Sequence, residues 1–323
     1  MMKPIAGLIS GIVLVLLSIY FIGTETVLNT LAQMNLNYLS WAIYLTLTIM
    51  LLHSIRLKMI LDAQKYQLGL WNATKIHVAS NTANLMTPVV KVGGIPLKVH
   101  YLSRANLPSM MSCASVIGEI ATETFSFYST FILILAYLTI TNHLPPNYTY
   151  LGILMFGLFV LFFLGSFKVL MSQKRLERFI KSVILRFTTI NAKLASKQLN
   201  CSINTFFSNV PLFYGTLAIS FFCRLLEFAR LSLIFLALGL NVGLGIVLTL
   251  WILEAFLSGL PWLPGSVGLV EIGSISVLAV LQMPAALAAS IILLSRVVSY
   301  WIPLFIGGAV MSRLKRHGVR CEL

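Results

Sequence analysis

The sequence predicts an all-α polytopic membrane protein with about eight transmembrane spans and two inverted, Pro/Gly-broken re-entrant hairpins. The composition is that of a membrane protein: the 323-residue chain is 58% hydrophobic and 10% charged, with a mean hydropathy of +0.92. Apolar runs long enough to cross a bilayer recur along the chain. Lys and Arg fall almost entirely in alternate connecting segments, and two apolar regions are interrupted by Pro and Gly.

Eight apolar segments carry this prediction. They lie at 5–22, 38–61, 109–140, 149–167, 211–238, 243–260, 269–282 and 284–311. The first is interpreted as an uncleaved span, because its apolar run is long for a signal peptide and no small-residue cleavage site follows. The segment 23–37 is interpreted as a linker. No stretch of soluble composition is long enough for a separate domain, so residues 1–323 are predicted to form a single membrane domain.

The distribution of basic residues predicts the orientation. With the N terminus inside, Lys3, the 56–104 segment, the 168–210 loop and the C-terminal tail hold every Lys and Arg outside the spans. The external linkers hold none. Such a positive-inside bias predicts a multi-pass protein of the cell membrane with cytoplasmic N and C termini. The same bias explains the net charge of +14, because the basic residues set the topology and face lipid headgroups. No nucleic-acid partner is therefore expected.

The loop 168–210 carries eight Lys or Arg and one Glu. Its charged and apolar residues alternate at helical spacing between Lys174 and Arg186. This pattern is typical of a cytoplasmic amphipathic helix on an anionic leaflet. A solvated basic linker that only sets topology explains the same pattern.

The two interruptions resemble each other. Thr87-Pro88 and Gly93-Gly94 break the region between the second and third spans, and Pro264-Gly265 with Gly268 break the region after the sixth. Backbone freed by Pro and Gly inside a membrane must be buried in protein or line a wet cavity. The first break is entered from the basic, cytoplasmic side and the second from outside. This predicts an inverted repeat of the kind found in transporters. The alternative is a surface loop at 70–105 and an ordinary helical hairpin at 243–282.

Four charged residues near the breaks are candidate site residues. Glu119 and Glu123 share one helix face at i,i+4 spacing, Glu271 follows the second break, and Arg296 lies well inside the last span. Charges at such depth face protein or water and pair with one another. We expect Arg296 to neutralise one of the three carboxylates and to yield to a lipid phosphate. The alternative is that these charges only hold helices together.

Motifs of enzymes and metal sites are missing from the sequence. It has no His-Glu-x-x-His, no Gly-x-Ser-x-Gly and no phosphate loop, and its histidines lack metal-ligand spacing. We therefore expect no catalytic residues, no metal and no cofactor.

Four short patterns, in order along nearly the whole chain, resemble those of the lysylphosphatidylglycerol synthase transmembrane-region family, also called flippase-like integral membrane proteins. They are Thr87-Pro88…Gly93-Gly94-Ile95-Pro96-Leu97-Lys98, Ala114-Ser115…Glu119-Ile120…Glu123, Pro264-Gly265-Ser266-Val267-Gly268-Leu269-Val270-Glu271, and Arg296…Pro303. Ile95 replaces the family's usual Glu and Ile120 its usual Arg, so part of the polar machinery of the first half is lost.

The resemblance implies a function for this chain. Relatives that make aminoacyl lipids carry an additional soluble synthase domain, and others carry a glycosyltransferase. We expect this chain to correspond to the lipid-translocating part, with membrane lipids of anionic or glycosylated headgroup as partners. The resemblance implies a substrate site at Glu119, Glu123, Glu271, Arg296, Pro88, Gly93, Gly94, Lys98, Pro264, Gly265 and Gly268.

Two other functions fit the same residues. One is a membrane-embedded lipid-modifying enzyme that uses Glu119 and Glu123 as general acid and base. The other is a non-catalytic scaffold that recruits a separate soluble synthase or glycosyltransferase through its basic loop.

Overall fold

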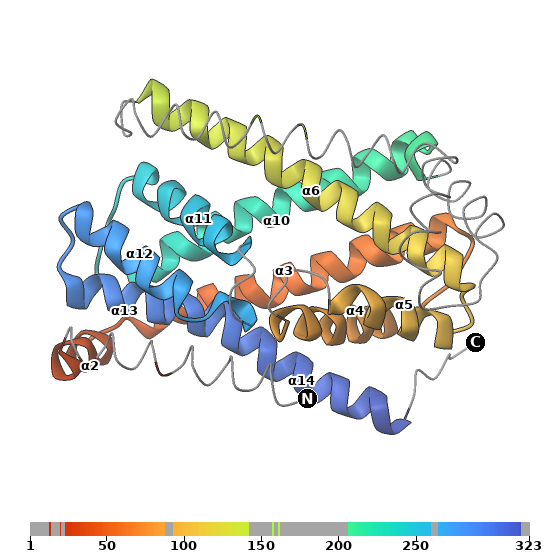
Figure 1. The fold of residues 1–323 in the computed structure, drawn as a ribbon, viewed down its shortest axis with the longest axis horizontal. Coiled ribbons are helices and arrows are strands. Elements are labelled where there is room, and N and C mark those ends of the chain that lie inside the picture. Colours follow the sequence, from red (N-terminus) through yellow and green to blue (C-terminus); the bar gives the residue numbers. More distant parts are fainter. Residues whose placement is uncertain are drawn as a thin grey trace. The chain divides into compact units, whose positions relative to one another are not determined.

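The computed structural model describes residues 23–87, 93–141, 206–259 and 264–317, together with the single positions 13, 20, 157 and 161. Every regular element in this part of the chain is helical (Figure 1), which confirms the all-α fold class there. The elements are α2 (Thr24–Ala32), α3 (Leu36–Ala63), α4 (Leu70–Leu85), α5 (Gly94–Arg104), α6 (Ser109–Ile140), α10 (Val210–Ala237), α11 (Leu244–Gly259), η1 (Pro264–Ser266), α12 (Leu269–Val280), α13 (Ala285–Arg296), η2 (Val297–Trp301) and α14 (Ile302–His317).

The predicted spans 38–61, 109–140, 211–238, 243–260, 269–282 and 284–311 all fall on described helices. Three of them are long and apolar enough to cross a membrane: α3, α6 and the continuous helix Ala285–Leu314. The helices α11 and α12 are apolar but shorter. Apart from single positions, the predicted spans 5–22 and 149–167 lie outside the described residues, as does most of the basic loop 168–210.

The linker predicted at 23–37 contains a helix, α2, that the sequence analysis did not predict. Glu25 in the first turn interacts favourably with the positive end of the helix dipole. Val27 is buried, and α2 packs against α13. A nine-residue helix is marginal by itself in water, so this packing accounts for its formation.

The described residues form two compact units. The first unit contains the described residues within 1–54, 74–98 and 225–320. The second unit contains the described residues within 55–73 and 99–224. The prediction of a single membrane domain stays a prediction. Both breaks predicted from Pro and Gly belong to the first unit.

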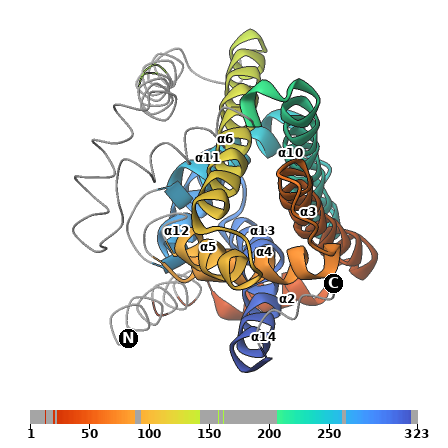
Figure 2. The same cartoon turned by 90° about the vertical axis from the view of Figure 1, so that its right-hand side faces the viewer.

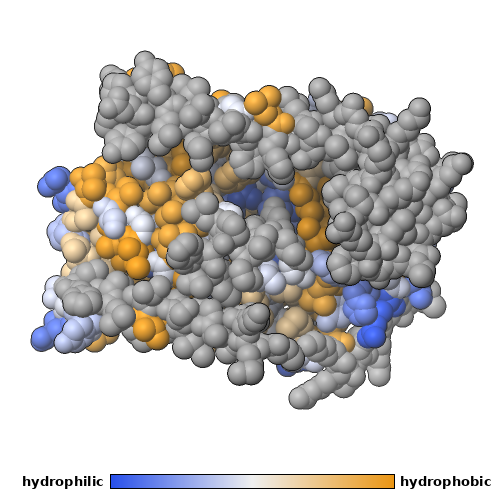
Figure 3. Space-filling view, in the orientation of Figure 1, coloured by the Kyte–Doolittle hydropathy of each residue, from blue (hydrophilic) through white to orange (hydrophobic). Residues whose placement is uncertain are grey.

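In the first unit, α11, α12 and α13 pack against one another in sequence order, and they lie side by side in both views (Figures 1 and 2). Val270 and Leu278 of α12 and Ile291 of α13 are buried among them. Apolar side chains gather on the coloured part of the surface at the end where α12 and α13 lie (Figure 3). Phe256 of α11 and Ile272 of α12 are among the exposed apolar residues. Such a surface suits lipid rather than water.

The last long helix of the first unit changes its winding half-way. Val297–Trp301 form a π turn, η2, between α13 and α14. Pro303 is the second residue of α14, and its missing N–H leaves a carbonyl of the preceding turn without its helical partner. Single π turns are frequent at functional sites. This one lies immediately after Arg296.

In the second unit, small and hydroxyl residues form the buried face of α6. The aromatic ring of Phe206 lies where a Cβ added to Gly118 would meet it. Small residues let helix backbones approach closely, which is a common way for membrane helices to pack. The buried members are Ser112, Ala114, Ser115, Gly118, Thr122, Ser126 and Thr130.

Candidate functional site

The break before α12 has an irregular backbone. Gly265 has a φ of 62° and Gly268 a φ of 91°, values that favour glycine. A side chain at position 265 would also collide with the Tyr300 ring. Pro264 begins the short helix η1, and the Ser266 hydroxyl donates to the Ser258 carbonyl at 3.2 Å. The Pro/Gly interruption predicted here is therefore confirmed as a break between α11 and α12.

Glu271 holds the first turn of α12. Its Oε2 accepts a hydrogen bond from the backbone N–H of Gly268, the N-cap residue, at 2.6 Å. Its Oε1 accepts a hydrogen bond from Arg296 Nε at 2.7 Å. The side chain of Glu271 is 3% exposed, so this charge lies in the interior and is compensated there. One carboxylate thus joins a helix start to a buried guanidinium.

Arg296, the last residue of α13, contacts several groups of the break before α12. Besides its pair with Glu271, its Nη2 donates to the carbonyl of Gly265 at 2.7 Å. Its guanidinium carbon lies 4.6 Å from the centroid of the Tyr300 ring, a cation–π distance. Within the described residues, its third nitrogen, Nη1, makes no hydrogen bond. We call Gly265, Glu271, Arg296 and Tyr300 the break cluster.

Tyr300 connects this cluster to the other break. Its hydroxyl donates to the carbonyl of Leu85, the last residue of α4, at 3.2 Å. A carbonyl at a helix C terminus lacks an intrahelical partner and needs such a donor. Sequence reasoning missed Tyr300. The available signal was its position four residues after Arg296, which places both on one helix face.

The first break is described on both sides of Pro88, which itself lies outside the described residues. Asn84 Oδ1 accepts a hydrogen bond from the Gly94 N–H, at the start of α5, at 2.7 Å. A Cβ at Gly93 or Gly94 would collide with α4 backbone or side-chain atoms, which explains the glycine pair. Lys98 is buried on α5, and its Nζ lies 3.3 Å from His77 Nδ1 on α4.

Glu119 and Glu123 belong to a different cluster, in the second unit. Arg56 Nη2 lies 3.4 Å from Glu119 Oε1 and 3.2 Å from Glu123 Oε2. Arg56 Nη1 donates to the Ser220 hydroxyl at 2.8 Å, and Arg224 Nη2 lies 3.6 Å from Glu123 Oε1. We call Arg56, Glu119, Glu123, Ser220 and Arg224 the helix cluster, because all five lie within long helices.

The structure therefore divides the predicted charged residues into two groups. Arg296 pairs with Glu271, one of the three partners predicted for it. The other two carboxylates pair with Arg56, a residue that the sequence analysis did not assign to the site. An Arg within an apolar span was the signal for it. No group of three metal-ligating side chains occurs among the described residues.

Comparison with known proteins agrees with this architecture. The sequence model of the lysylphosphatidylglycerol synthase transmembrane region matches residues 5–307. The chain belongs to this family. The match confirms the family suggested by the sequence patterns, and with the apolar helices it identifies this family member as a multi-pass membrane protein.

Curated relatives extend over the same length. A UPF0104 membrane protein of Methanothermobacter thermautotrophicus is 24% identical over 309 residues, covering 91% of this chain and 90% of the relative. A UPF0104 membrane protein of Methanocaldococcus jannaschii is 23% identical over 321 residues, with coverages of 96% and 94%. One from Pyrococcus horikoshii is 21% identical, with 98% of each chain covered. This family member is thus similar to these membrane proteins over at least 90% of both chains.

Proposed function

We propose that this protein is a flippase-like membrane protein that translocates or binds a charged or glycosylated lipid headgroup. The observation that carries the proposal is the buried Arg296 guanidinium. Two of its nitrogens are held by Glu271 and by the broken backbone at Gly265. Its Nη1 has no hydrogen-bond partner among the described residues. A guanidinium fixed in this way presents remaining donors in a defined direction, which suits recognition of a phosphate.

Helix lengths support the two re-entrant hairpins. The arms of the first are α4 and α5, with 16 and 11 residues, and those of the second are α11 and α12, with 16 and 12. A full crossing needs about 20 residues. Paired short segments, each interrupted by Pro and Gly, are the arrangement expected for a binding site near the midplane of a transporter with about eight spans.

In this mechanism the headgroup enters a polar site at the breaks while its acyl tails stay in the bilayer. Arg296 would bind the lipid phosphate through its nitrogens, and Glu271 would keep the guanidinium oriented. Tyr300 contacts the Gly265 region and the end of α4, so a shift of the π turn would reach both breaks. Lys98, buried on α5 of the same unit, is a further candidate headgroup contact.

Residue Arg296 offers a direct test in liposomes. Purified wild-type protein should move lipids with charged or glycosylated headgroups between leaflets, and Arg296→Lys should fold but lose most of this movement, because an ammonium cannot reproduce the guanidinium fork. Lys58→Arg changes a partly exposed basic residue paired with Asp62; it is the matched control and should transport normally. Wild-type rates for Arg296→Lys would contradict the proposed site.

The same assay separates the alternatives. A lipid-modifying enzyme would change the mass of the lipid, and a scaffold would leave lipids in place until its soluble partner enzyme is added. We propose no catalytic role, because Glu119 and Glu123 are each paired with Arg56 rather than presented to a substrate.

Orientation is tested separately by cysteine labelling in intact cells. The proposed topology in the cell membrane, with both termini cytoplasmic, requires a cysteine at Asn37 to react from outside and one at Arg320 to be protected. Labelling of position 320 from outside would overturn this topology.

A further inference from the structure

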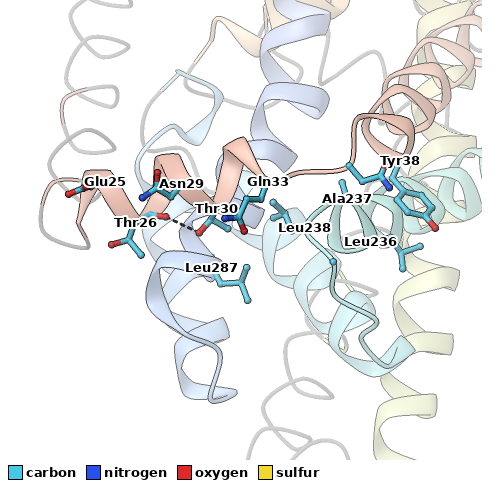
Figure 4. A pocket seen from close by; sticks show the side chains of 12 residues that line it. Glu25, Thr26, Asn29, Thr30, Gln33, Tyr38, Leu236, Ala237, Leu238 and Leu287 are labelled. Atoms are coloured by element: carbon cyan, nitrogen blue, oxygen red, sulfur yellow. Dashed lines mark hydrogen bonds between the residues drawn. The ribbon is translucent and has the colours of Figure 1, made fainter.

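A second candidate binding site lies in the first unit, around α2 (Figure 4). It is a pocket of about 720 Å³. Its walls are α2, the beginning of α3, the end of α10 at Leu236–Gly239, and Leu287 of α13. The backbone N–H of Asn35 donates to the Ala237 carbonyl at 2.7 Å, which joins two of these walls. The site contains none of the residues of the break cluster.

The helix α2 presents a polar stripe to this pocket. Thr26, Asn29, Thr30 and Gln33 follow the spacing i, i+3, i+4, i+7, which places them on one helix face. Figure 4 shows these side chains along the same helix. Val27, on the other side of the helix, is buried, and α2 packs against α13. The packing therefore fixes the direction in which the stripe points.

The lining has a distinct chemistry. Among the described residues that line it, Glu25 carries the only formal charge, and none is Lys or Arg. The other polar groups are hydroxyls and amides, which donate and accept hydrogen bonds without charge. The Thr30 hydroxyl donates to the carbonyl of Thr26 at 2.8 Å. Within the described residues, the side-chain amides of Asn29 and Gln33 make no hydrogen bond, so their donors and acceptors are available to a ligand.

We propose that this pocket binds a saccharide. Neighbouring sugar hydroxyls both donate and accept, and adjacent amides with a carboxylate complement that pattern. Tyr38 at the beginning of α3 also lines the pocket, and its ring offers a flat surface for the apolar face of a sugar. A phosphate is disfavoured because the one charged side chain among the described lining residues, Glu25, is negative. The volume lies within the usual range of about 300–1,000 Å³ for small-molecule sites.

The saccharide has two potential sources, a free sugar or the headgroup of a glycolipid. Binding is measured on purified full-length protein in lipid nanodiscs, by ligand-observed NMR with methyl glycosides and by thermal shift. The same measurements use nanodiscs with and without a glycolipid bearing the same sugar. Competition between glycolipid and methyl glycoside would identify the headgroup as a ligand, and binding of the glycoside alone would identify the free sugar.

Variants locate the binding. Asn29→Ala and Gln33→Ala should each weaken glycoside binding by about tenfold, the loss expected for one or two hydrogen bonds. Asn37→Ala removes an exposed amide nearby that does not line the pocket, and it should bind as the wild type. Saccharide binding that is unchanged in both pocket variants would overturn the proposal.

Small amines test whether the pocket binds a cation instead of a saccharide. Ethanolamine and choline test for a cation attracted by Glu25 alone. If these amines bind and no glycoside does, the site is an ammonium site and the proposal is wrong. The proposal does not depend on lipid transport, because a variant with Arg296→Lys should lose translocation and keep saccharide binding.

Discussion

The break cluster and the helix cluster both contain Arg and Glu side chains, but the groups that these side chains bind differ. In the break cluster, carboxylate and guanidinium bond to backbone groups of Gly265 and Gly268 as well as to each other, at 2.6–2.7 Å. In the helix cluster, the ion pairs join side chains of uninterrupted helices at 3.2–3.6 Å. Arg56 Nε is buried there and has no hydrogen-bond partner within the described residues.

The difference separates two uses of buried charge. Ion pairs between intact helices are replaceable in principle, because a well-packed apolar set often stabilises as much as a buried pair. Charges that satisfy broken backbone are not replaceable in this way, because the freed N–H and C=O groups must still find partners. The contrast predicts different outcomes for equivalent mutations in the two clusters.

The largest effect is expected from Arg296→Ala. It leaves Glu271 as an uncompensated buried charge and removes the donor to the Gly265 carbonyl, so the free energy of unfolding should fall by about 3–5 kcal/mol. Unfolding in mixed micelles with increasing SDS measures this loss. Arg313→Ala, an exposed basic residue of α14, is the control and should change stability little. A loss below about 1 kcal/mol would show that the pair is dispensable.

The next prediction compares rescue in the two clusters. Arg56→Met with Glu119→Met removes both members of one pair and leaves Glu123 with Arg224, so the double variant should recover most of what Arg56→Met alone loses. Arg296→Met with Glu271→Met should remain about 2 kcal/mol or more below wild type, because the Gly265 carbonyl and the Gly268 N–H lose their partners. Equal recovery in both clusters, measured by the same unfolding method, would remove the distinction between them.

A smaller effect is expected from Gly265→Ala. The residue has positive φ, and a Cβ there meets the Tyr300 ring, so we expect a loss of about 1–3 kcal/mol and a reduced rate of lipid movement. Gly308→Ala in α14 meets no atom within 4 Å and is the matched control, with unchanged or slightly raised stability. Wild-type stability for Gly265→Ala would contradict the positive φ and the close approach of Tyr300 at this position.

The smallest predicted change is that of Tyr300→Phe. It keeps the ring next to Arg296 and removes only the hydrogen bond to the Leu85 carbonyl, so stability should fall by about 1 kcal/mol. If Tyr300 couples the two breaks, lipid movement should fall more than stability does. Tyr44→Phe changes an exposed tyrosine that keeps its ring contact with Trp41, and it should alter neither property.

Local composition determined a large part of this protein. Helices α3, α6 and α10 begin and end within two residues of the predicted spans 38–61, 109–140 and 211–238. The break before α12 was also predictable, because Pro lacks a donor and Gly permits the positive φ found at Gly265 and Gly268. The i,i+4 spacing was enough to place Glu119 and Glu123 together on one face of α6.

Tertiary structure alone decided which charges meet. Arg56 is far from Glu119 and Glu123 in sequence, and Tyr300 is 215 residues from Leu85. Periodicity gives the face of a helix on which a side chain lies, but the partner depends on which helices pack together and in what register. The same reason explains the α2 pocket: its polar stripe is present in the sequence at 26–33, but only the packing of α2 against α13 makes it a helix wall. A nine-residue segment cannot determine its own conformation when the energy that stabilises it comes from contacts elsewhere in the chain.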